Sequence, residues 1–246
     1  MNLKNNTVLI TGGSSGIGFE LSKVLIQKGN TVIICGKSSE KLLVAKKAEP
    51  KLITYQCDLS DSRECIDFAN RIKENHPELN ILINNAAIVN KIDFLKDDKS
   101  LEFAENEYQT NLLAPIRLIR LLYNSISGKE PSAIINITTG LIYVPREIYP
   151  FYNSSKSALH SFTQTLRMSL NKEKTEVIEV MFPAVITPWH KGNPPKIAIP
   201  AEDAVNQMIK GLEKGKPEIR VGGAKILYLM SRIAPAFALK KVNSIK

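Results

Sequence analysis

The chain has 246 residues, 43% of them hydrophobic, and a formal net charge of +9. This composition is that of a packed globular protein and excludes general disorder. No apolar run approaches the ~18 residues that a membrane-spanning helix needs, and at this length we expect a single domain over residues 1–246.

The start of the chain and its cysteines indicate the compartment. The first four residues lead straight into an apolar strand, without the pattern of a secretory signal peptide, so we expect a cytoplasmic protein. Cys35, Cys57 and Cys65 form no C-x-x-C pair and show no metal spacing, and the three histidines are scattered. We expect reduced cysteines in or near the core and no metal site.

Short β-rich runs alternate with helical stretches along the chain. The predicted strands cover residues 7–11, 31–35, 52–56, 81–84, 133–138, 177–182 and 218–221. The predicted helices cover residues 16–28, 62–75, 100–125, 152–172 and 201–215, with one more starting after a cap at Ser38 or Ser39. This alternation predicts a three-layer Rossmann-type α/β fold, a doubly wound parallel sheet of about seven strands flanked by helices on both faces.

A glycine-rich turn joins the first predicted strand to the first helix. It reads TGGSSGIG over residues 11–18. Glycines let the backbone turn sharply and approach a pyrophosphate, while free N–H groups at the helix N-terminus attract the anion. A tight turn without a ligand is the plainer interpretation, but the position of the motif in an opening β-α-β unit favours dinucleotide binding.

Further motifs follow along the chain. They are Asp58-Leu59 after the third strand, NNAA at residues 84–87, Asn111 within a helix, YNSSK at 152–156 and PAVIT at 183–187. Together with the glycine-rich turn they match, in order, the motifs of the classical short-chain dehydrogenases/reductases. The sequence resembles this family over almost its whole length, and within it the DltE-like oxidoreductases of bacteria. The resemblance implies a nicotinamide cofactor and the catalytic set Asn111, Thr139, Tyr152 and Lys156.

Tyr152 and Lys156 are one helical turn apart, so both side chains project from the same face. An unperturbed tyrosine has a pKa near 10, and a nearby ammonium group favours the phenolate. Lys156, together with the positive nicotinamide ring of an oxidised cofactor, would supply the ~4 kcal/mol that brings this pKa to about 7. An isolated Y-x-x-x-K often arises by chance on a surface, but here its place in the family order favours Tyr152 as a general acid/base.

The resemblance assigns roles to two further side chains. The family has a serine thirteen residues before the tyrosine, and this sequence has Thr139 there. Its hydroxyl can hydrogen-bond a substrate carbonyl or a developing alkoxide, although the alternative is that Thr139 only ends a strand. Asn111 would hold a water that links Lys156 to solvent. A buried, helix-kinking asparagine with satisfied hydrogen bonds is the other interpretation.

The end of the second strand indicates which nicotinamide cofactor is used. NAD-preferring sites have an acidic residue there, whereas NADP sites lose it and add a cation. Here Gly36 takes the acidic position and Lys37 follows; Lys37, Ser38 and Ser14 can contact a 2′-phosphate. We predict NADP(H), with NAD(H) as the alternative if Lys37 is only an exposed loop charge. The predicted cofactor-binding residues are Gly12, Ser14, Ser15, Gly16, Ile17, Gly18, Lys37, Asp58, Leu59, Asn85, Ala86, Tyr152, Lys156, Pro183 and Thr187.

The substrate end of the site is predicted from aromatic residues. Residues 187–200 contain four prolines and indicate an irregular loop, which carries Trp189 and His190. Tyr143, Tyr149 and Phe151 flank the catalytic tyrosine. These rings would suit a small carbonyl or alcohol, or they are ordinary packing residues.

The end of the chain is basic. Residues 202–246 hold nine lysines and arginines against four acidic residues. Within them, residues 225–246 form an apolar, basic C-terminal helical extension that Pro235 should split into two short helices. Packing on its own domain or in a dimer is the plainer interpretation, and contact with an anionic membrane surface the alternative. We find no nucleic-acid motif and expect no nucleic-acid partner.

The function that these features predict is hydride transfer between NADP(H) and a carbonyl or alcohol substrate, acting as a reductase. The alternative is an NADP(H)-binding sensor or scaffold with little catalysis. It is supported by Thr139 and by Ala87 and Ala184, which replace family glycines and put the nicotinamide pose in doubt. The family's habit of pairing through its long helices implies a homodimer or homotetramer.

Overall fold

The computed structural model describes residues 1–244, in which a seven-stranded sheet has the order β3-β2-β1-β4-β5-β6-β9. All neighbouring strands run parallel. The bounds of the strands are β1 (Thr7–Thr11), β2 (Thr31–Gly36), β3 (Ile53–Gln56), β4 (Ile81–Asn84), β5 (Ala133–Thr139), β6 (Glu176–Phe182) and β9 (Glu218–Arg220). The strand order reverses between β1 and β4, so a crevice for ligands is expected at their carboxyl ends.

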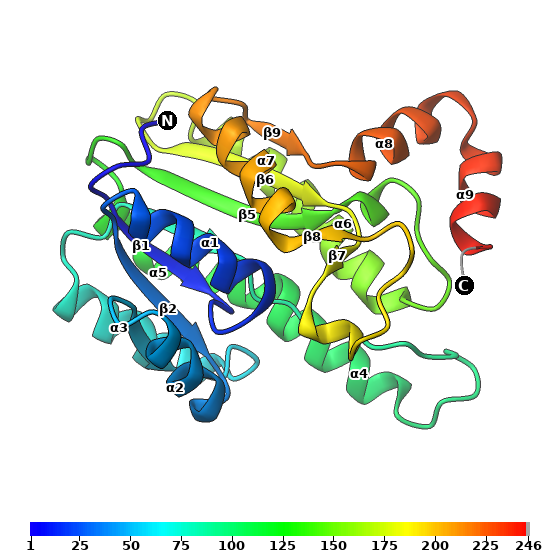
Figure 1. Cartoon of the computed structure of the whole chain (residues 1–246), viewed down its shortest axis with the longest axis horizontal. Helices are drawn as coiled ribbons and strands as arrows, with labels where there is room; N and C mark the ends of the chain where they lie inside the picture. The colour runs from blue at the N-terminus through cyan, green and yellow to red at the C-terminus, as the bar shows by residue number, and fades with distance from the viewer. Residues whose placement is uncertain (245–246) are drawn as a thin grey trace.

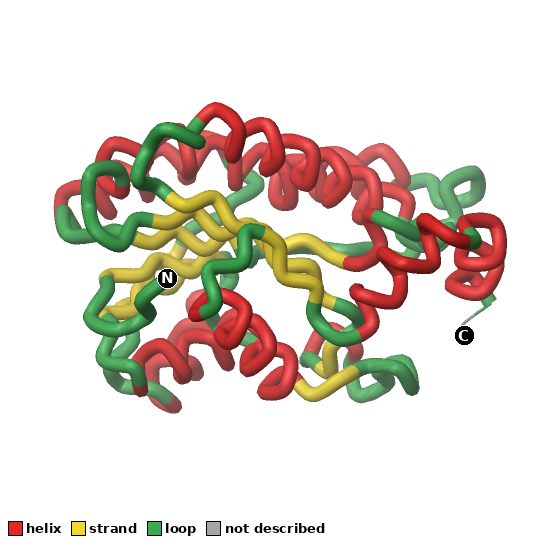
Figure 2. The backbone as a smooth tube through the Cα atoms, turned by 90° about the horizontal axis from the view of Figure 1, so that it is seen from above, coloured by secondary structure: helices red, strands yellow, loops and turns green. Residues whose placement is uncertain are grey.

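Helices cover both faces of the sheet, as Figure 2 shows edge-on. One apolar core joins the sheet to α1 (Gly16–Gln27), α2 (Ser39–Ala48) and α7 (Ala201–Glu213). A second core joins the other face to α3 (Ser62–Asn75), α5 (Ala114–Ile126) and α6 (Pro150–Ser169). Figure 1 shows how the strands run between these layers. The predicted three-layer, doubly wound parallel fold is confirmed.

The predicted continuous helix over residues 100–125 is wrong in one respect. The structure divides it into α4 (Ser100–Tyr108), a π-helical turn (Gln109–Leu113) and α5. Asn111, at the centre of this turn, is fully buried and bonds to the backbone of Ile88 in another segment. A π turn inserts one residue into a helix, which hydrophobic periodicity does not detect.

The segment that follows β6 is more ordered than the predicted irregular loop. A two-stranded pairing joins β7 (Val185–Ile186) to β8 (Ile199–Pro200), and a short 3₁₀ turn covers Pro188–His190. This pairing ties the ends of the segment together, and Thr187 between them lies beside Gly16 of the glycine-rich turn.

The C-terminal segment forms two helices, α8 (Gly223–Ile233) and α9 (Pro235–Asn243), and Pro235 begins the second as predicted. They lie at one end of the molecule, beyond β9 (Figure 1). Over residues 1–244, no helix combines the length and hydropathy needed to span a bilayer. The three cysteines are buried and form no disulfide, which confirms the prediction of reduced cysteines in or near the core.

Candidate active site

The glycine-rich turn between β1 and α1 leaves a cradle at the N-terminus of α1. Gly12 and Gly16 have φ values of +64° and +56°, which only glycine adopts readily. A Cβ atom on Gly12 would lie 2.8 Å from the Cα of Ala86, so the turn is in close contact with the residues that follow β4. Ser15 precedes the helix without capping it through its side chain, and the first turn holds no acidic residue. The first N–H groups are therefore available to an anion.

Polar side chains join this turn to the end of β4. The Thr11 hydroxyl oxygen accepts hydrogen bonds from the backbone N–H groups of Asn85 and Ala86, at 3.0 Å each. The Asn85 amide donates to the carbonyl oxygens of Thr11 and Gly12, at 2.9 and 3.2 Å. Two of the predicted cofactor residues, Asn85 and Ala86, thus hold the turn in shape.

Lys37 and Asp58 follow the ends of β2 and β3 and form an ion pair. Lys37 Nζ lies 2.6 Å from Asp58 Oδ2, and the Lys37 side chain is 78% exposed. A Cβ on Gly36 would lie 3.3 Å from Ser14 Oγ, which places Ser14 beside the same strand end. Burial alone would raise the pKa of Asp58, but hydrogen bonds from Lys37 and Ser60 outweigh it and lower the pKa. The carboxylate therefore stays charged and holds Lys37 at this position.

Among the other predicted cofactor residues, Thr187 lies against the turn, while Leu59 and Pro183 contact other parts of the fold. Thr187 approaches Gly16, because a Cβ on Gly16 would lie 3.2 Å from Thr187 Cγ2. The side chains of Leu59 and Ile17 pack in the two apolar cores. Pro183 ends the β6 segment beside Gly222.

Tyr152 stands in the first turn of α6, facing the end of β5. Its side chain is half-buried. Burial raises the pKa of Tyr152 to about 12, a hydrogen bond with Thr139 opposes this rise, and the nearby Glu107 adds to it. Thr139 also accepts a hydrogen bond from the N–H of Leu141 at 3.2 Å, which orients its hydroxyl. Tyr152 therefore keeps its proton at neutral pH.

Lys156 lies one turn further along α6 and is 2% exposed. Its ammonium group donates to the carbonyl oxygen of Ile137 at 2.8 Å. Burial lowers the pKa of Lys156 to about 8, and the charge of Glu179 opposes the shift. The lysine thus titrates close to working pH and is bound to β5, directly under the strand end that carries Thr139.

The Asn111 side chain connects three segments. Its Oδ1 accepts from the N–H of Ile88, and its Nδ2 donates to the carbonyl oxygen of Ile88, both at 2.9 Å. Nδ2 also donates to Ser155 Oγ at 3.2 Å. The side chain is therefore committed to protein partners, as in the interpretation of a buried, satisfied asparagine. It holds the β4–α4 loop against α6 next to Lys156.

Two buried carboxyl groups near the site were not predicted. Glu179, fully buried in β6, accepts from Thr138 Oγ1 at 2.5 Å and lies 2.7 Å from His160 Nδ1. The only sequence signal for it is an acidic residue inside an otherwise apolar strand, VIEVMF, together with a histidine four residues after Lys156.

The second unpredicted group is Glu107, which is 1% exposed on α4. Its Oε1 accepts from the backbone N–H and the amide of Asn90, at 2.8 and 2.9 Å. Its Oε2 is buried without a hydrogen-bond partner among the described residues. Burial raises the pKa of Glu107, while the bonds from Asn90 oppose the rise. The residue lies four positions before Asn111, on the same helical face.

The aromatic residues divide into two groups. Trp189 forms an edge-to-face contact with Tyr149 at 6.0 Å, and its indole N–H donates to Val89 at 3.3 Å. This pair bridges the 187–200 segment and the β4–α4 loop near the site. Tyr143 instead packs against Tyr228 of α8, and Phe151 against Phe94. For Tyr143 and Phe151 these contacts agree with the alternative that they are ordinary packing residues.

Comparisons with known proteins agree with this geometry. Residues 6–197 match the family described as short chain dehydrogenase. The chain is 40% identical over 224 residues to the uncharacterized oxidoreductase DltE of Bacillus subtilis, covering 89% of each protein. A short chain dehydrogenase from Burkholderia cenocepacia in complex with NADP has a TM-score of 0.85 at 22% identity, covering 100% of both chains. A Burkholderia phymatum short chain dehydrogenase/reductase in complex with NAD has a TM-score of 0.81 at 15% identity, covering 100% of this chain and 98% of the other. These two structures share the fold.

Proposed function

Because the chain belongs to the short-chain dehydrogenase family of NAD(P)-dependent oxidoreductases, we propose that it transfers hydride between NADP(H) and a carbonyl or alcohol substrate. Tyr152 is the general acid/base of this reaction. The observation that carries the proposal is the convergence of Tyr152, Thr139 and Lys156 at the ends of β5 and α6, on the sheet edge that also holds the glycine-rich turn.

The residues present fit a nicotinamide dinucleotide. A turn with positive-φ glycines and an uncapped helix N-terminus suits the pyrophosphate. NADP(H) is favoured over NAD(H), because the strand end that would carry an acid in an NAD site has Gly36, followed by Lys37. The solved structures of similar fold contain NADP or NAD, so both remain compatible with the architecture. When bound, the nicotinamide supplies or accepts the hydride.

Tyr152 acts on the substrate oxygen. In the direction of reduction, its phenol donates the proton that the carbonyl oxygen takes up as the carbon receives hydride. The raised pKa of Tyr152, about 12, keeps this proton available at neutral pH and favours the reductase direction. Thr139 donates a hydrogen bond to the same oxygen as negative charge develops on it.

Lys156 lies one helical turn after Tyr152 on α6 and is the positive group of the proposed catalytic set. Its ammonium favours the phenolate that remains once Tyr152 has given up its proton. The pKa of about 8 for Lys156 lies near working pH, so the lysine can pass a proton back to the tyrosine. Asn111 positions α6 for both residues through Ser155.

A cofactor-binding sensor or scaffold with little catalysis is the second candidate. The observation that favours it is that Lys156 bonds to Ile137, while burial holds the pKa of Tyr152 at about 12. A binding protein would need no proton transfer and could keep this arrangement. The two candidates differ in turnover and in its dependence on Tyr152.

The experiment is fluorescence titration with NADPH and NADH, followed by a panel of small carbonyl substrates with the wild type and Tyr152→Phe. NADPH binding with oxidation that the variant lacks supports the reductase. Binding without turnover on any carbonyl favours the sensor. If neither nucleotide binds, the assignment of the glycine-rich turn is wrong.

We also infer a homodimer or homotetramer, on the basis of the family's pairing through its long helices. Light scattering of the full chain tests this. A monomer at the concentrations used for turnover would contradict it.

A further inference from the structure

The chain has a one-sided distribution of charge after β9. No acidic residue follows Glu218 in the sequence. The basic residues in this stretch are Arg220, Lys225, Arg232, Lys240, Lys241 and Lys246, of which Lys246 lies outside the described residues. The α8–α9 pair therefore forms a protruding element of a single charge sign.

The same helices expose large apolar side chains. On α8, Ile226, Leu229 and Ile233 are 64%, 54% and 80% exposed. Their spacing puts them on one helical face. Phe237 and Leu239 of α9 are 60% and 46% exposed. We call the three α8 residues the apolar face; Phe237 and Leu239, two positions apart, lie on different sides of α9. Three large apolar side chains exposed on one helical face need an explanation, because monomeric proteins seldom expose contiguous apolar patches.

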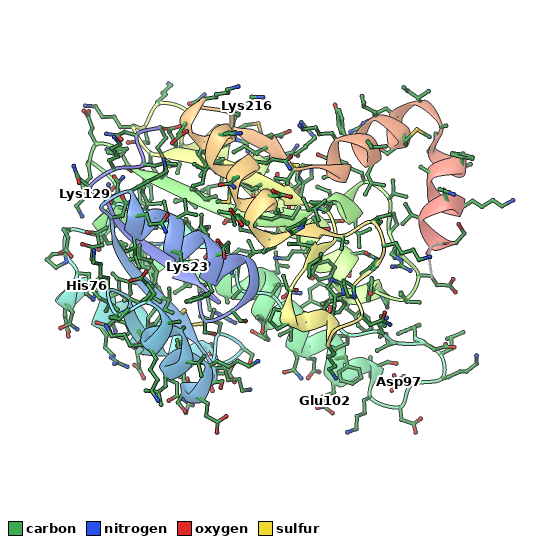
Figure 3. The ribbon with its side chains drawn as sticks, viewed as in Figure 1. Lys23, His76, Asp97, Glu102, Lys129 and Lys216 are labelled. Atoms are coloured by element: carbon green, nitrogen blue, oxygen red, sulfur yellow. The ribbon has the colours of Figure 1, made fainter. Side chains whose placement is uncertain are left out.

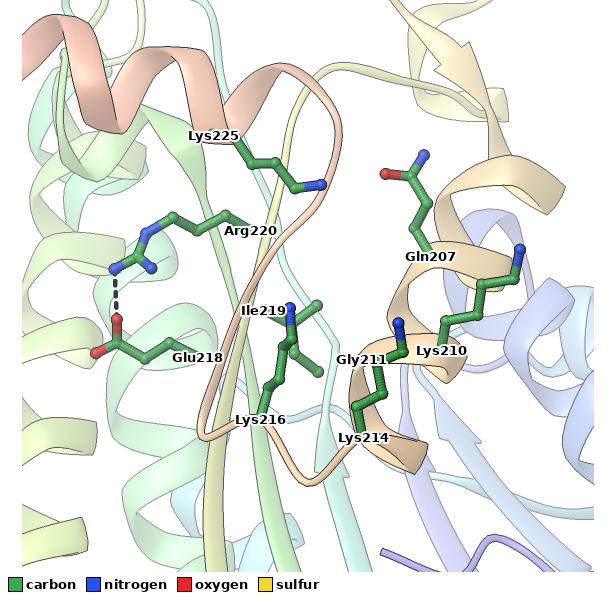
Figure 4. Close-up of a pocket in the computed structure, with 9 residues that line it drawn as sticks. All are labelled: Gln207, Lys210, Gly211, Lys214, Lys216, Glu218, Ile219, Arg220 and Lys225. Carbon is green, nitrogen blue, oxygen red and sulfur yellow. Dashed lines mark hydrogen bonds and ion pairs between the residues drawn. The ribbon is translucent and has the colours of Figure 1, made fainter.

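A groove of ≈ 320 Å³ lies where α7, β9 and the start of α8 meet. It is lined by Lys210, Lys214, Lys216 and Lys225, and Figure 4 shows their ammonium groups around the opening. We call it the basic groove. Its one acid, Glu218, is paired with Arg220 at 2.5 Å. Within residues 1–244, none of the four lysines is in an ion pair, and Figure 3 labels Lys216 at the rim of the molecule.

The basic groove and the apolar face are continuous. Lys225 lines the groove and also begins the exposed side of α8. Leu229 follows it by one helical turn, so the two side chains are neighbours on the same face. Any ligand that spans both features must therefore be anionic and apolar at once.

We propose that the basic groove and the apolar face form one surface that docks on an anionic phospholipid bilayer. The lysines contact headgroup phosphates, and the apolar face enters the boundary with the acyl chains. A second copy of the chain fits less well, because a symmetric contact would bring the same lysines and arginines together without an acid to neutralise them. The surface contains no catalytic or cofactor residue, so the proposal is independent of the reaction.

The test is sedimentation of the full chain with vesicles of phosphatidylcholine alone and of phosphatidylcholine mixed with phosphatidylserine. We expect binding to the anionic vesicles only, and loss of binding at high salt. Lys216→Gln with Lys225→Gln should weaken it about thirtyfold, since each charge near the surface contributes about fivefold. Leu229→Ser with Ile233→Ser should weaken it at least about tenfold.

Matched controls come from α2, which exposes Leu43 and Val44 at 61% and 66%. Leu43→Ser with Val44→Ser, and Lys41→Gln with Lys47→Gln, should leave vesicle binding unchanged. Thermal melting verifies that every variant folds.

Three outcomes would overturn the proposal. The first is that wild type ignores the anionic vesicles at low salt. The second is that the apolar variant binds as well as wild type while inositol hexaphosphate displaces the protein, which would make the groove a site for a free anion. The third is that wild type binds no vesicles but is a dimer in light scattering, while the apolar variant is a monomer. That result would assign the face to a second copy.

Discussion

His160 Nδ1 lies 2.7 Å from Oε2 of the fully buried Glu179, where α6, the helix that also carries Tyr152 and Lys156, packs on β6. The Thr138 hydroxyl donates to the other carboxyl oxygen at 2.5 Å. Thr138 and its neighbours in β5 thus link to three groups of the site, because Ile137 accepts from Lys156 and Thr139 bonds with Tyr152. The charge of Glu179 opposes the effect of burial on the pKa of Lys156.

Replacing Glu179 tests this arrangement. Glu179→Gln keeps a partner for Thr138 but removes the charge, so the pKa of Lys156 should fall further below about 8. The limb of the pH–turnover profile that belongs to Lys156 should then move to lower pH. Glu179→Ala leaves buried polar groups unsatisfied and should cost about 2 kcal/mol in urea unfolding. An unchanged profile in Glu179→Gln would show that the carboxylate does not act on Lys156.

The Glu179–His160 pair illustrates what the sequence does not reveal. The order of strands and helices follows from local patterns, and the cradle and the Tyr152–Lys156 pair follow from motifs with fixed spacing. Glu179 and His160 come from different elements, 19 residues apart, and meet only because α6 packs over β6. An acidic residue in an apolar strand indicates a buried partner, but pairing rules alone do not say which one.

Thr139 should be replaceable by serine but not by valine. Its hydroxyl accepts from Leu141 and bonds with Tyr152, and both functions need only the oxygen. Thr139→Ser should therefore keep turnover within about threefold, whereas Thr139→Val should lower kcat by about a hundredfold, as expected for loss of a hydrogen bond to a developing alkoxide. Steady-state kinetics on one substrate measures both. Equal activity of the valine variant would remove Thr139 from the mechanism.

Lys37 should control the choice between NADPH and NADH. Its ammonium lies 2.6 Å from Asp58, just after β2, where NADP sites have a cation for the 2′-phosphate. Lys37→Ala should weaken NADPH by about 10- to 100-fold, the range of a hydrogen bond to a charged group, and NADH hardly at all. Fluorescence titration with both nucleotides gives the ratio of the dissociation constants. A parallel loss for both would mean that Lys37 only shapes the loop.

The contact between Lys37 and Asp58 could not be predicted, although both residues were. Each was assigned to the cofactor separately, from its position after a strand. The ion pair depends on β2 and β3 ending at the same edge of the sheet, which the registers of these neighbouring strands bring about. The π turn at Asn111 is similar, since the bonds to Ile88 that stabilise it come from a segment 23 residues away.

Glu107 should influence the pH dependence of Tyr152. Burial is the largest cause of the raised pKa of Tyr152, and the charge of the buried Glu107 carboxyl group raises it further, because two negative charges close together are unfavourable. Glu107→Gln should lower the pKa of Tyr152 and move the alkaline limb of the pH–turnover profile to lower pH. The amide can still accept from Asn90, so the fold should be retained. If the limb does not move while Glu107→Ala unfolds the protein, Glu107 is only structural.

The pKa of Lys156 predicts how stability varies with pH. The folded protein lowers this pKa from 10.5 to about 8, so between these values the unfolded chain binds the proton and the folded chain does not. The free energy of unfolding therefore rises with pH across this window, because the penalty for burying an ammonium group disappears as the folded lysine becomes neutral. The full change corresponds to about 3 kcal/mol.

The measurement compares urea unfolding of the wild type and Lys156→Met at several pH values between 7 and the ordinary pKa of lysine. The difference between the two proteins isolates Lys156, because most other groups titrate alike in both. The wild type should gain stability relative to the variant as pH rises above about 8. Tyr152 has the opposite effect only above its ordinary pKa of 10, since its folded pKa is raised to about 12. A pH-independent difference below pH 10 would mean that Lys156 stays charged in the folded chain, bound to Ile137, and the proposed proton return from Lys156 to Tyr152 would then be wrong.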